Sequence, residues 1–223
     1  MNQVLKFAMG VVSAGVAGGA MAGPVSGQAN LADLIDNDGS VIVGDKLFSN
    51  FDYVAGGDMP DASGVTVVDL VDGFGNFGIQ FQGAFMDLAG GGASDALITF
   101  DVTVLDPNFE ISSALLAGDL AIVNGSGGSS FGGVTESFLT ANASDTLSIF
   151  TGTAGTQLSD SVSFLQPVST LTVQKDIILF AQDGDADAVT ISTIDQSFEQ
   201  IPEPGSLALL GLGALAMVRR RRG

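Results

Sequence analysis

Residues 77–86 read Phe-Gly-Ile-Gln-Phe-Gln-Gly-Ala-Phe-Met and predict a β-strand. Apolar side chains at alternate positions fall on one face of this run and polar or small ones on the other: Phe77, Ile79, Phe81 and Phe85 against Gln80, Gln82 and Ala84. Because successive strand residues point to opposite faces, a period of two is typical of a strand with one buried face. The stretch therefore predicts a sheet packed on one side against a hydrophobic core.

The same alternation returns in residues 98–104, and Asp106-Pro107-Asn108 ends that run with turn-forming residues. Shorter strand-like runs recur between clusters of Gly, Asp, Asn and Ser: 41–43, 46–53, 65–71, 119–123, 134–140, 146–150, 161–165, 170–173, 177–181 and 189–194. Residues 30–36 predict a short helix, and the fold is expected to end at residues 199–201. The pattern predicts an all-β chain folded as a two-sheet β-sandwich with jelly-roll-like connections.

Charge and composition limit the function of this domain. All 25 acidic residues lie between residues 23 and 204, where Lys46 and Lys175 are the basic residues, so the formal charge there is −23. Such a surface repels nucleic acids and attracts cations, so no nucleic-acid partner is expected. Cysteine is absent, so the fold must depend on its core and not on disulfides.

Residues 1–22 have the three parts of a secretory signal peptide. Lys6 is an early cation, residues 7–17 form an apolar stretch, and the small residues Ala20 and Ala22 define a cleavage site. The alternative is a buried first helix, but six glycines within the first 27 residues disfavour a helix interior. The exported chain is expected to begin at Gly23.

The C-terminal segment combines a proline motif, an apolar run and a basic cluster. Pro202 and Pro204 flank Glu203 and disfavour a helix there. Residues 205–218 are apolar on every side, and as a helix they would span about 21 Å, less than the roughly 30 Å hydrocarbon core. Four arginines follow the apolar run, and their long side chains can reach lipid headgroups: Arg219, Arg220, Arg221 and Arg222. Such a basic cluster favours the cytoplasmic side of the membrane. These features predict transient membrane insertion with the acidic domain outside.

This order of features resembles the PEP-CTERM sorting signal of exported bacterial proteins. In that family the Pro-Glu-Pro motif, the apolar helix and the arginine-rich end are recognised by a membrane-embedded exosortase, a cysteine transpeptidase-like enzyme. The resemblance implies that Pro202, Glu203 and Pro204 form the motif and that an exosortase-like enzyme processes the chain. Residues 95–104 and 192–198 also resemble the exported domains of such proteins. A generic tail anchor and a buried hairpin helix are the alternatives, and a GPI signal fits less well because its tail does not end in arginines.

Three aspartates at alternate positions suggest a calcium loop: Asp183, Asp185 and Asp187. The loop departs from the EF-hand pattern, because Ala188 stands where glycine is needed and Ile194 where a bidentate glutamate is needed. The main alternative is a solvated hairpin turn between the two flanking strands. Calcium is therefore the candidate ion, and no cofactor is expected.

Catalysis has few suitable groups. The chain has neither histidine nor cysteine, which removes the usual general base, thiol nucleophile and preferred zinc ligand. A paired-carboxylate glycosidase is chemically possible, but the phenylalanines that could bind sugars fit core positions. The same scarcity of aromatic platforms weakens a carbohydrate-binding module, and no catalytic residue is expected.

The chain is expected to divide into a signal peptide (1–22), an exported β-sandwich domain (23–200) with flanking signal and apolar helices, and a PEP-CTERM sorting signal (201–223). The favoured function is that of an exported, non-enzymatic surface or extracellular-matrix protein associated with exopolysaccharide. Its expected partners are the secretion machinery and an exosortase-like enzyme, and its expected location is the cell envelope or the extracellular space, reached through the inner membrane. The alternative is a calcium- or polymer-binding adhesive module that uses loops at one end of the sandwich. A carboxylate-dependent hydrolase ranks below both.

Overall fold

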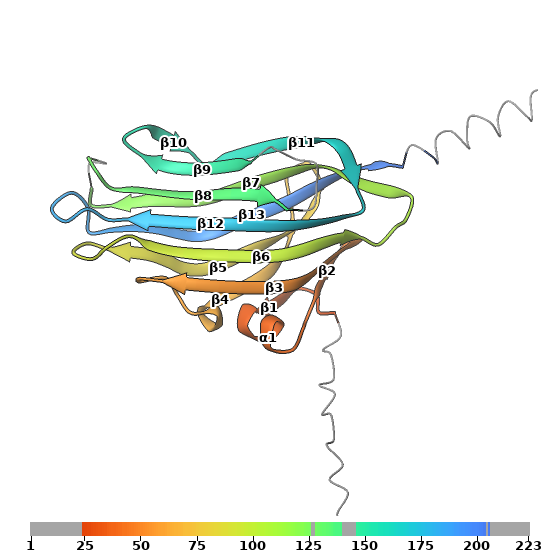
Figure 1. Ribbon diagram of the computed structural model, residues 1–223, viewed down its shortest axis with the longest axis horizontal. Helices are drawn as coiled ribbons and strands as arrows, with labels where there is room; N and C mark the ends of the chain where they lie inside the picture. Colours follow the sequence, from red (N-terminus) through yellow and green to blue (C-terminus); the bar gives the residue numbers. More distant parts are fainter. Residues whose placement is uncertain (1–23, 126–127, 140–145, 204, 206–223) are drawn as a thin grey trace, which may run out of the picture.

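The computed structural model describes residues 24–125, 128–139, 146–203 and 205 of the 223-residue chain (Figure 1). The signal peptide expected at residues 1–22 and the apolar helix expected at 205–218, except for exposed Gly205, lie outside the described residues. In the described part of the chain, no helix has both the length and the apolar character needed to cross a membrane.

The described chain forms two antiparallel sheets, which Figure 1 shows as two stacked layers. The six-stranded sheet has, in spatial order, β1 (Gln28–Asn30), β4 (Val65–Val71), β5 (Phe77–Leu88), β13 (Ala188–Pro202), β7 (Phe109–Val123) and β11 (Ser159–Val168). The seven-stranded sheet has β10 (Gly155–Gln157), β9 (Leu147–Gly152), β8 (Phe131–Phe138), β12 (Thr170–Phe180), β6 (Ser94–Val104), β3 (Lys46–Gly56) and β2 (Val41–Val43). The predicted all-β, two-sheet fold is confirmed.

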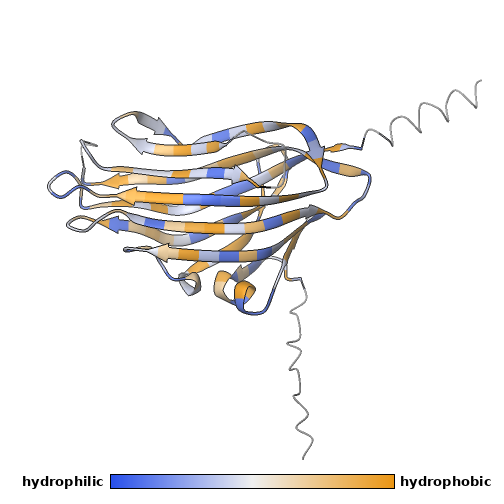
Figure 2. Cartoon of the chain, in the orientation of Figure 1, coloured by the Kyte–Doolittle hydropathy of each residue, from blue (hydrophilic) through white to orange (hydrophobic). Residues whose placement is uncertain are grey.

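Phenylalanines from both sheets meet in the core. The ring centroid of Phe100 on β6 lies 5.7 Å from that of Phe81 on β5 and 6.2 Å from that of Phe48 on β3. Phe48 in turn lies 6.2 Å from Phe198 on β13, and all four side chains are buried. Burial of each ring stabilises the fold by about 1.5–3 kcal/mol, so these contacts hold the two sheets together. The alternating bands along the strands in Figure 2 are the pattern that the sequence predicts.

The short helix predicted at residues 30–36 is present as α1 (Leu31–Asp36). The Asn30 side chain accepts a hydrogen bond from the Ala32 backbone N–H at 3.0 Å, which caps the first turn. Leu31 and Leu34 are buried, so the helix covers one margin of the core beside β3. A single-turn 3-10 helix, η1 (Ala62–Gly64), precedes β4.

Strand β12 is continuous where the sequence predicts two strands separated by Gln174-Lys175-Asp176. That prediction is wrong because Lys175 does not face solvent: it is fully buried and pairs in register with Glu136 on β8. The apolar alternation of the strand therefore continues through a charged residue. The pairing with Glu136, which is distant in the sequence, keeps residues 174–176 extended. Local composition does not reveal this partner.

The last strand, β13, also differs from its prediction, since the strand expected at residues 189–194 continues to Pro202. It lies between β5 and β7 in the middle of its sheet, and β7 itself begins at Phe109, ten residues before the predicted start. The expected hairpin between residues 181 and 188 is wrong, because β12 and β13 belong to different sheets. The chain crosses between layers there, as it does from β5 to β6, from β6 to β7 and from β7 to β8.

Candidate functional site

The described surface is anionic because its two basic residues point inward. Lys46 and Lys175 are 1% and 0% exposed. Over the described residues, the acidic side chains at the surface thus face solvent without a neighbouring exposed cation. Such a surface attracts cations and repels polyanions over about a Debye length, roughly 8–10 Å at physiological salt.

Asp185 joins two loops at one end of the sandwich. Its carboxylate accepts hydrogen bonds from the backbone N–H groups of Gly128, Ser129 and Ser130, each at 3.0 Å. These bonds, that of Ser130 foremost, hold the pKa of Asp185 well below its usual range. Because backbone donors already occupy this carboxylate, its observed role is to fix the segment that leads into β8.

The other two aspartates of the predicted calcium loop lie apart from this contact. Asp187 accepts a hydrogen bond from the Asn124 side-chain amide at 2.7 Å, and Asp183 is exposed at the turn. Among the described residues, no three acidic side chains come together in an arrangement that could hold a metal ion. Calcium binding by Asp183, Asp185 and Asp187 stays a prediction.

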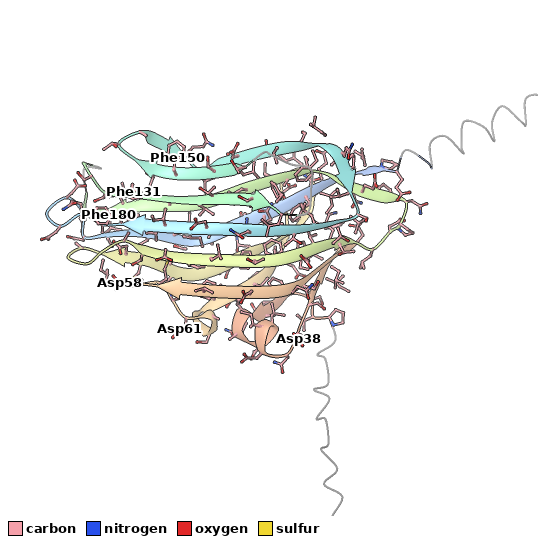
Figure 3. All side chains as sticks on the ribbon, in the orientation of Figure 1. Asp38, Asp58, Asp61, Phe131, Phe150 and Phe180 are labelled. Atoms are coloured by element: carbon pink, nitrogen blue, oxygen red, sulfur yellow. The ribbon has the colours of Figure 1, made fainter. Side chains whose placement is uncertain are left out.

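An aromatic groove lies beside this loop on the outer face of the seven-stranded sheet. Figure 3 labels Phe150, Phe131 and Phe180, which project from the neighbouring strands β9, β8 and β12. Gly133 pairs with Phe150 on one side and with Ile178 on the other, so a residue without a side chain leaves a hollow between apolar walls. Phe131 and Ile178 are 40% and 42% exposed, and the Phe131 ring centroid lies 5.8 Å from that of Phe180.

The groove has a polar edge that Asp185 positions. Ser129 and Ser130, whose N–H groups bind the Asp185 carboxylate, line the groove together with Phe131, Phe150 and Thr153. The hydroxyl groups open to a ligand are those of Ser129 and Thr153, because Ser130 is buried and its Oγ accepts a hydrogen bond from the Gln182 N–H at 3.0 Å. Apolar ring faces beside a few hydroxyl groups are typical of sites that bind ligands with both apolar and polar surfaces. We define the aromatic groove as Phe131, Phe150 and Ile178 with this serine edge. Phe180 packs against Phe131 beside the groove.

The expectation that the phenylalanines fit core positions is wrong for this groove and for Phe74, which is 86% exposed. One signal was present in the sequence: Phe150 alternates with Leu147 and Ile149, which are both buried, so it falls on the opposite face of β9. The run from Ile177 to Phe180 is apolar on both faces and does not reveal which face is outside.

The sorting motif begins inside the sheet. Pro202 pairs with Phe109 at the end of β13 and β7, and the backbone N–H of Glu203 donates to the carbonyl oxygen of Asn108 at 2.7 Å. Asn108 belongs to the predicted turn, where Asp106 accepts hydrogen bonds from its backbone and side-chain N–H groups at 2.9 and 2.8 Å. These bonds lower the pKa of Asp106. Pro202 and Glu203, the first two residues of the motif, are therefore fixed at a corner of the sandwich.

The outer surface of the six-stranded sheet also carries a groove with carboxylates. Asp72 and Glu199 line this groove. Although burial raises the pKa of Asp72, hydrogen bonds from Ser197, Asn76 and Phe74 lower it below its ordinary value. In the described part of the chain, the carboxyl group whose pKa is raised belongs to Glu136, which lies in the core and not in a cleft. A general acid at a substrate cleft has a raised pKa, whereas the pKa of Asp72 in this groove is lowered.

Comparison with known proteins identifies the tail. The PEP-CTERM protein-sorting motif matches residues 200–222, as the sequence predicts. The molecule is thus an exported protein with a β-sandwich domain, sorted through the membrane to the cell envelope or extracellular space. More particularly, it carries the sorting motif of the proteins that an exosortase, a membrane enzyme, processes.

The remaining comparisons do not bear on function. No curated protein matches the chain significantly. Among solved structures, the enzymatically active domain of tailspike protein 4 of bacteriophage CBA120 aligns with 12% identity and a TM-score of 0.28. The alignment covers 67% of this chain and 19% of the phage chain.

Proposed function

We propose that the protein is a non-enzymatic surface or extracellular-matrix component associated with exopolysaccharide. The secretion machinery exports it, the C-terminal helix holds it in the membrane for a time, and an exosortase-like enzyme releases it. The observation that carries this proposal is the sorting motif at residues 200–222, joined to β13 without a linker. The domain that is delivered to the surface is a jelly-roll-like sandwich with an anionic surface. The repeated crossing of the chain between the two sheets supports the jelly-roll-like description.

The position of the motif makes processing compatible with a stable product. Pairing in β13 ends at Pro202, so cleavage beyond this residue leaves all the described strands in place. The Glu203 N–H contact with Asn108 fixes the start of the motif at the edge of the sheet. Extended chain at such a point presents its backbone to a protease or transpeptidase more readily than a helix does. The released domain keeps its central strand and its core.

The sorting proposal is tested in the native host with a variant in which Pro202, Glu203 and Pro204 are all changed to alanine. The wild type is expected in the envelope or medium, shorter than the variant by about 2 kDa, and the variant is expected to remain in the inner membrane. Glu199→Ala, which removes a neighbouring exposed acid outside the motif, is the matched control and should follow the wild type. Equal sorting of the triple variant and the wild type would contradict the proposal.

A second candidate function is polymer binding by the aromatic groove, favoured by the exposed Phe131 ring beside a hydroxyl edge. Ring faces of this kind stack on the apolar faces of sugars, while the exposed hydroxyl groups of Ser129 and Thr153 can bind sugar hydroxyls. Phe131→Ala is expected to lower co-sedimentation of the protein with exopolysaccharide from its host. Phe74→Ala removes another exposed ring, outside the groove, and is expected to have no effect. Equal binding by both variants would exclude the groove.

Calcium binding is the remaining proposal for the loop. Millimolar calcium should raise the melting temperature, because any cation reduces self-repulsion of an anionic domain. A specific site requires more: calcium must act more strongly than magnesium, and Asp183→Asn must abolish a saturable shift. Asp183 is the informative position because it is exposed, whereas Asp185 binds three backbone N–H groups.

A further inference from the structure

Three polar side chains meet inside the core between the two sheets. Lys175 on β12 and Glu136 on β8 are paired in register, and Gln196 reaches them from β13 in the opposite sheet. The Lys175 ammonium nitrogen, Nζ, contacts both Glu136 Oε2 and Gln196 Oε1. All three side chains are fully buried.

Along β12 the cluster has apolar neighbours on the inward face. Val173 and Ile177, the inward-facing neighbours of Lys175 on β12, are 0% exposed. Glu136 Oε1 and Gln196 Nε2 have no hydrogen-bond partner of ordinary geometry, although the Gln196 side chain lies near enough to Glu136 to lower the pKa of its carboxyl group. A buried ion pair with unsatisfied atoms is more costly than a well-packed apolar core, so stability alone does not account for these three residues.

Burial changes the protonation of the pair. It lowers the pKa of Lys175, although the neighbouring Glu136 carboxylate opposes this shift, and it raises the pKa of Glu136 against the effect of Lys175. Both shifts favour transfer of one proton from the ammonium group to the carboxylate. The product is an uncharged amine, which is nucleophilic, in contact with a carboxamide and a carboxylic acid.

We propose that Lys175 and Gln196 form an intramolecular isopeptide bond, with Glu136 as the catalytic acid and base. The Nζ lone pair adds to Cδ of Gln196 while the carbonyl π electrons move to Oε1. Glu136 transfers its proton to Nε2 and takes one from Nζ, so it ends in its starting state. The C=O bond then re-forms, the Cδ–Nε2 bond breaks, and ammonia leaves. One amine and one primary amide become one secondary amide and one ammonia.

The bond would join the middle of one sheet to the middle of the other. Lys175 is held between β6 and β8, and Gln196 between β5 and β7. A covalent link at this point would limit the unfolded chain as a disulfide does, in a protein that has no cysteine. It would also resist reduction, which suits a domain that works outside the cell.

The position of Gln196 depends on a glycine. A Cβ at Gly78 on β5 would lie 1.9 Å from the Gln196 carbonyl oxygen, so only glycine allows β5 and β13 to approach this closely. Gln196 is thereby held at a fixed depth opposite Lys175, as a near-attack geometry requires.

Cleavage of the denatured protein after glutamate tests the bond directly. Residues 137–199 form one such peptide, and it contains both Lys175 and Gln196. This peptide is expected to be lighter than its sequence mass by about 17 Da, one ammonia, and to give no fragment ions from breaks between residues 175 and 196. An unmodified mass would overturn the proposal. A bond on Glu136 would instead block cleavage after that residue and give one uncut peptide, 111–199, lighter by one water, about 18 Da, which would overturn Gln196 as the acceptor.

Trypsin provides a control within the same chain. Between residues 24 and 203 its cleavage sites follow Lys46 and Lys175. The denatured wild type should be cut after Lys46 and not after Lys175, because an acylated lysine is not a substrate. Glu136→Gln keeps the size of the side chain but cannot shuttle the proton, so cleavage after Lys175 should return. A linked Glu136→Gln variant would overturn the role of Glu136, and if this variant does not fold, the wild-type peptide still decides the proposal.

Discussion

Lys46 and Lys175 occupy similar positions with different outcomes. Each contacts an acid and the side-chain oxygen of a glutamine from β13: Asp45 at 3.2 Å and Gln200 at 2.8 Å for Lys46, Glu136 and Gln196 for Lys175. The Asp45 side chain is 25% exposed, whereas Glu136 is fully buried. Lys46 also lies 5.5 Å from the centroid of the Phe77 ring, which stabilises its charge.

The two lysines have similar partners, so the difference between them lies in how deeply the acidic partner is buried. That burial decides whether the lysine stays charged or becomes a neutral amine. Burial lowers the pKa of both lysines, and Asp45 opposes this effect at Lys46. At Lys46 the acid reaches water, so the ion pair persists. At Lys175 water is excluded from both partners, and a neutral amine beside an amide becomes accessible. One strand thus carries a structural contact near its end and a reactive contact at its centre.

Replacement of each lysine by methionine should give the largest difference. Lys175→Met leaves Glu136 buried without its partner and removes the proposed link to Gln196, so it should lower the free energy of unfolding by about 3–5 kcal/mol. Lys46→Met leaves an acid that can turn to solvent and should cost about 1 kcal/mol. Guanidinium unfolding of both variants measures the two values, and equal losses would contradict the distinction.

Gly78→Ala should have the next largest effect, because the new methyl group would meet the Gln196 carbonyl oxygen. Separation of β5 from β13 to relieve this overlap should cost about 1–3 kcal/mol, measured by thermal unfolding. Gly73→Ala is the matched control, since a Cβ there meets no atom within 4 Å. A Gly78→Ala variant as stable as Gly73→Ala would mean that the close approach of these strands is not required.

The sequence predicts some parts of this molecule and not others for a definite reason. The alternation of apolar and polar residues predicts β5 and β6. The sorting motif can be recognised from the sequence because its residues are contiguous. The Lys175 cluster is missed because its partner Glu136 lies 39 residues away and its glutamine 21 residues away, in the other sheet. The serine edge is missed similarly, since Asp185 binds Ser130 across 55 residues. Residues that depend on a distant partner cannot be read from local composition.

Asp185 is a surface charge held by hydrogen bonds, in contrast to the two buried lysines. Its replacement should have the smallest effect on stability. Its pKa is lowered in the folded protein, so its contribution to stability is full above the usual aspartate pKa of about 3.9 and is lost as pH falls below that value. Asp185→Asn should therefore flatten the decline of melting temperature as the pH falls below about 4. Asp183→Asn, in the same loop, controls for net charge, and identical acid limbs for wild type and Asp185→Asn would contradict this role.

The central claim is that this domain is exported and released by processing at both ends. The most direct measurement is the intact mass of the protein recovered from the surface or medium of its native host, with sequencing of both termini. We expect a chain that begins at Gly23 and ends near Pro202-Glu203-Pro204, about 4 kDa lighter than the full sequence. Surface protein that still begins at Met1, or that still carries Arg219 to Arg222, would contradict the account.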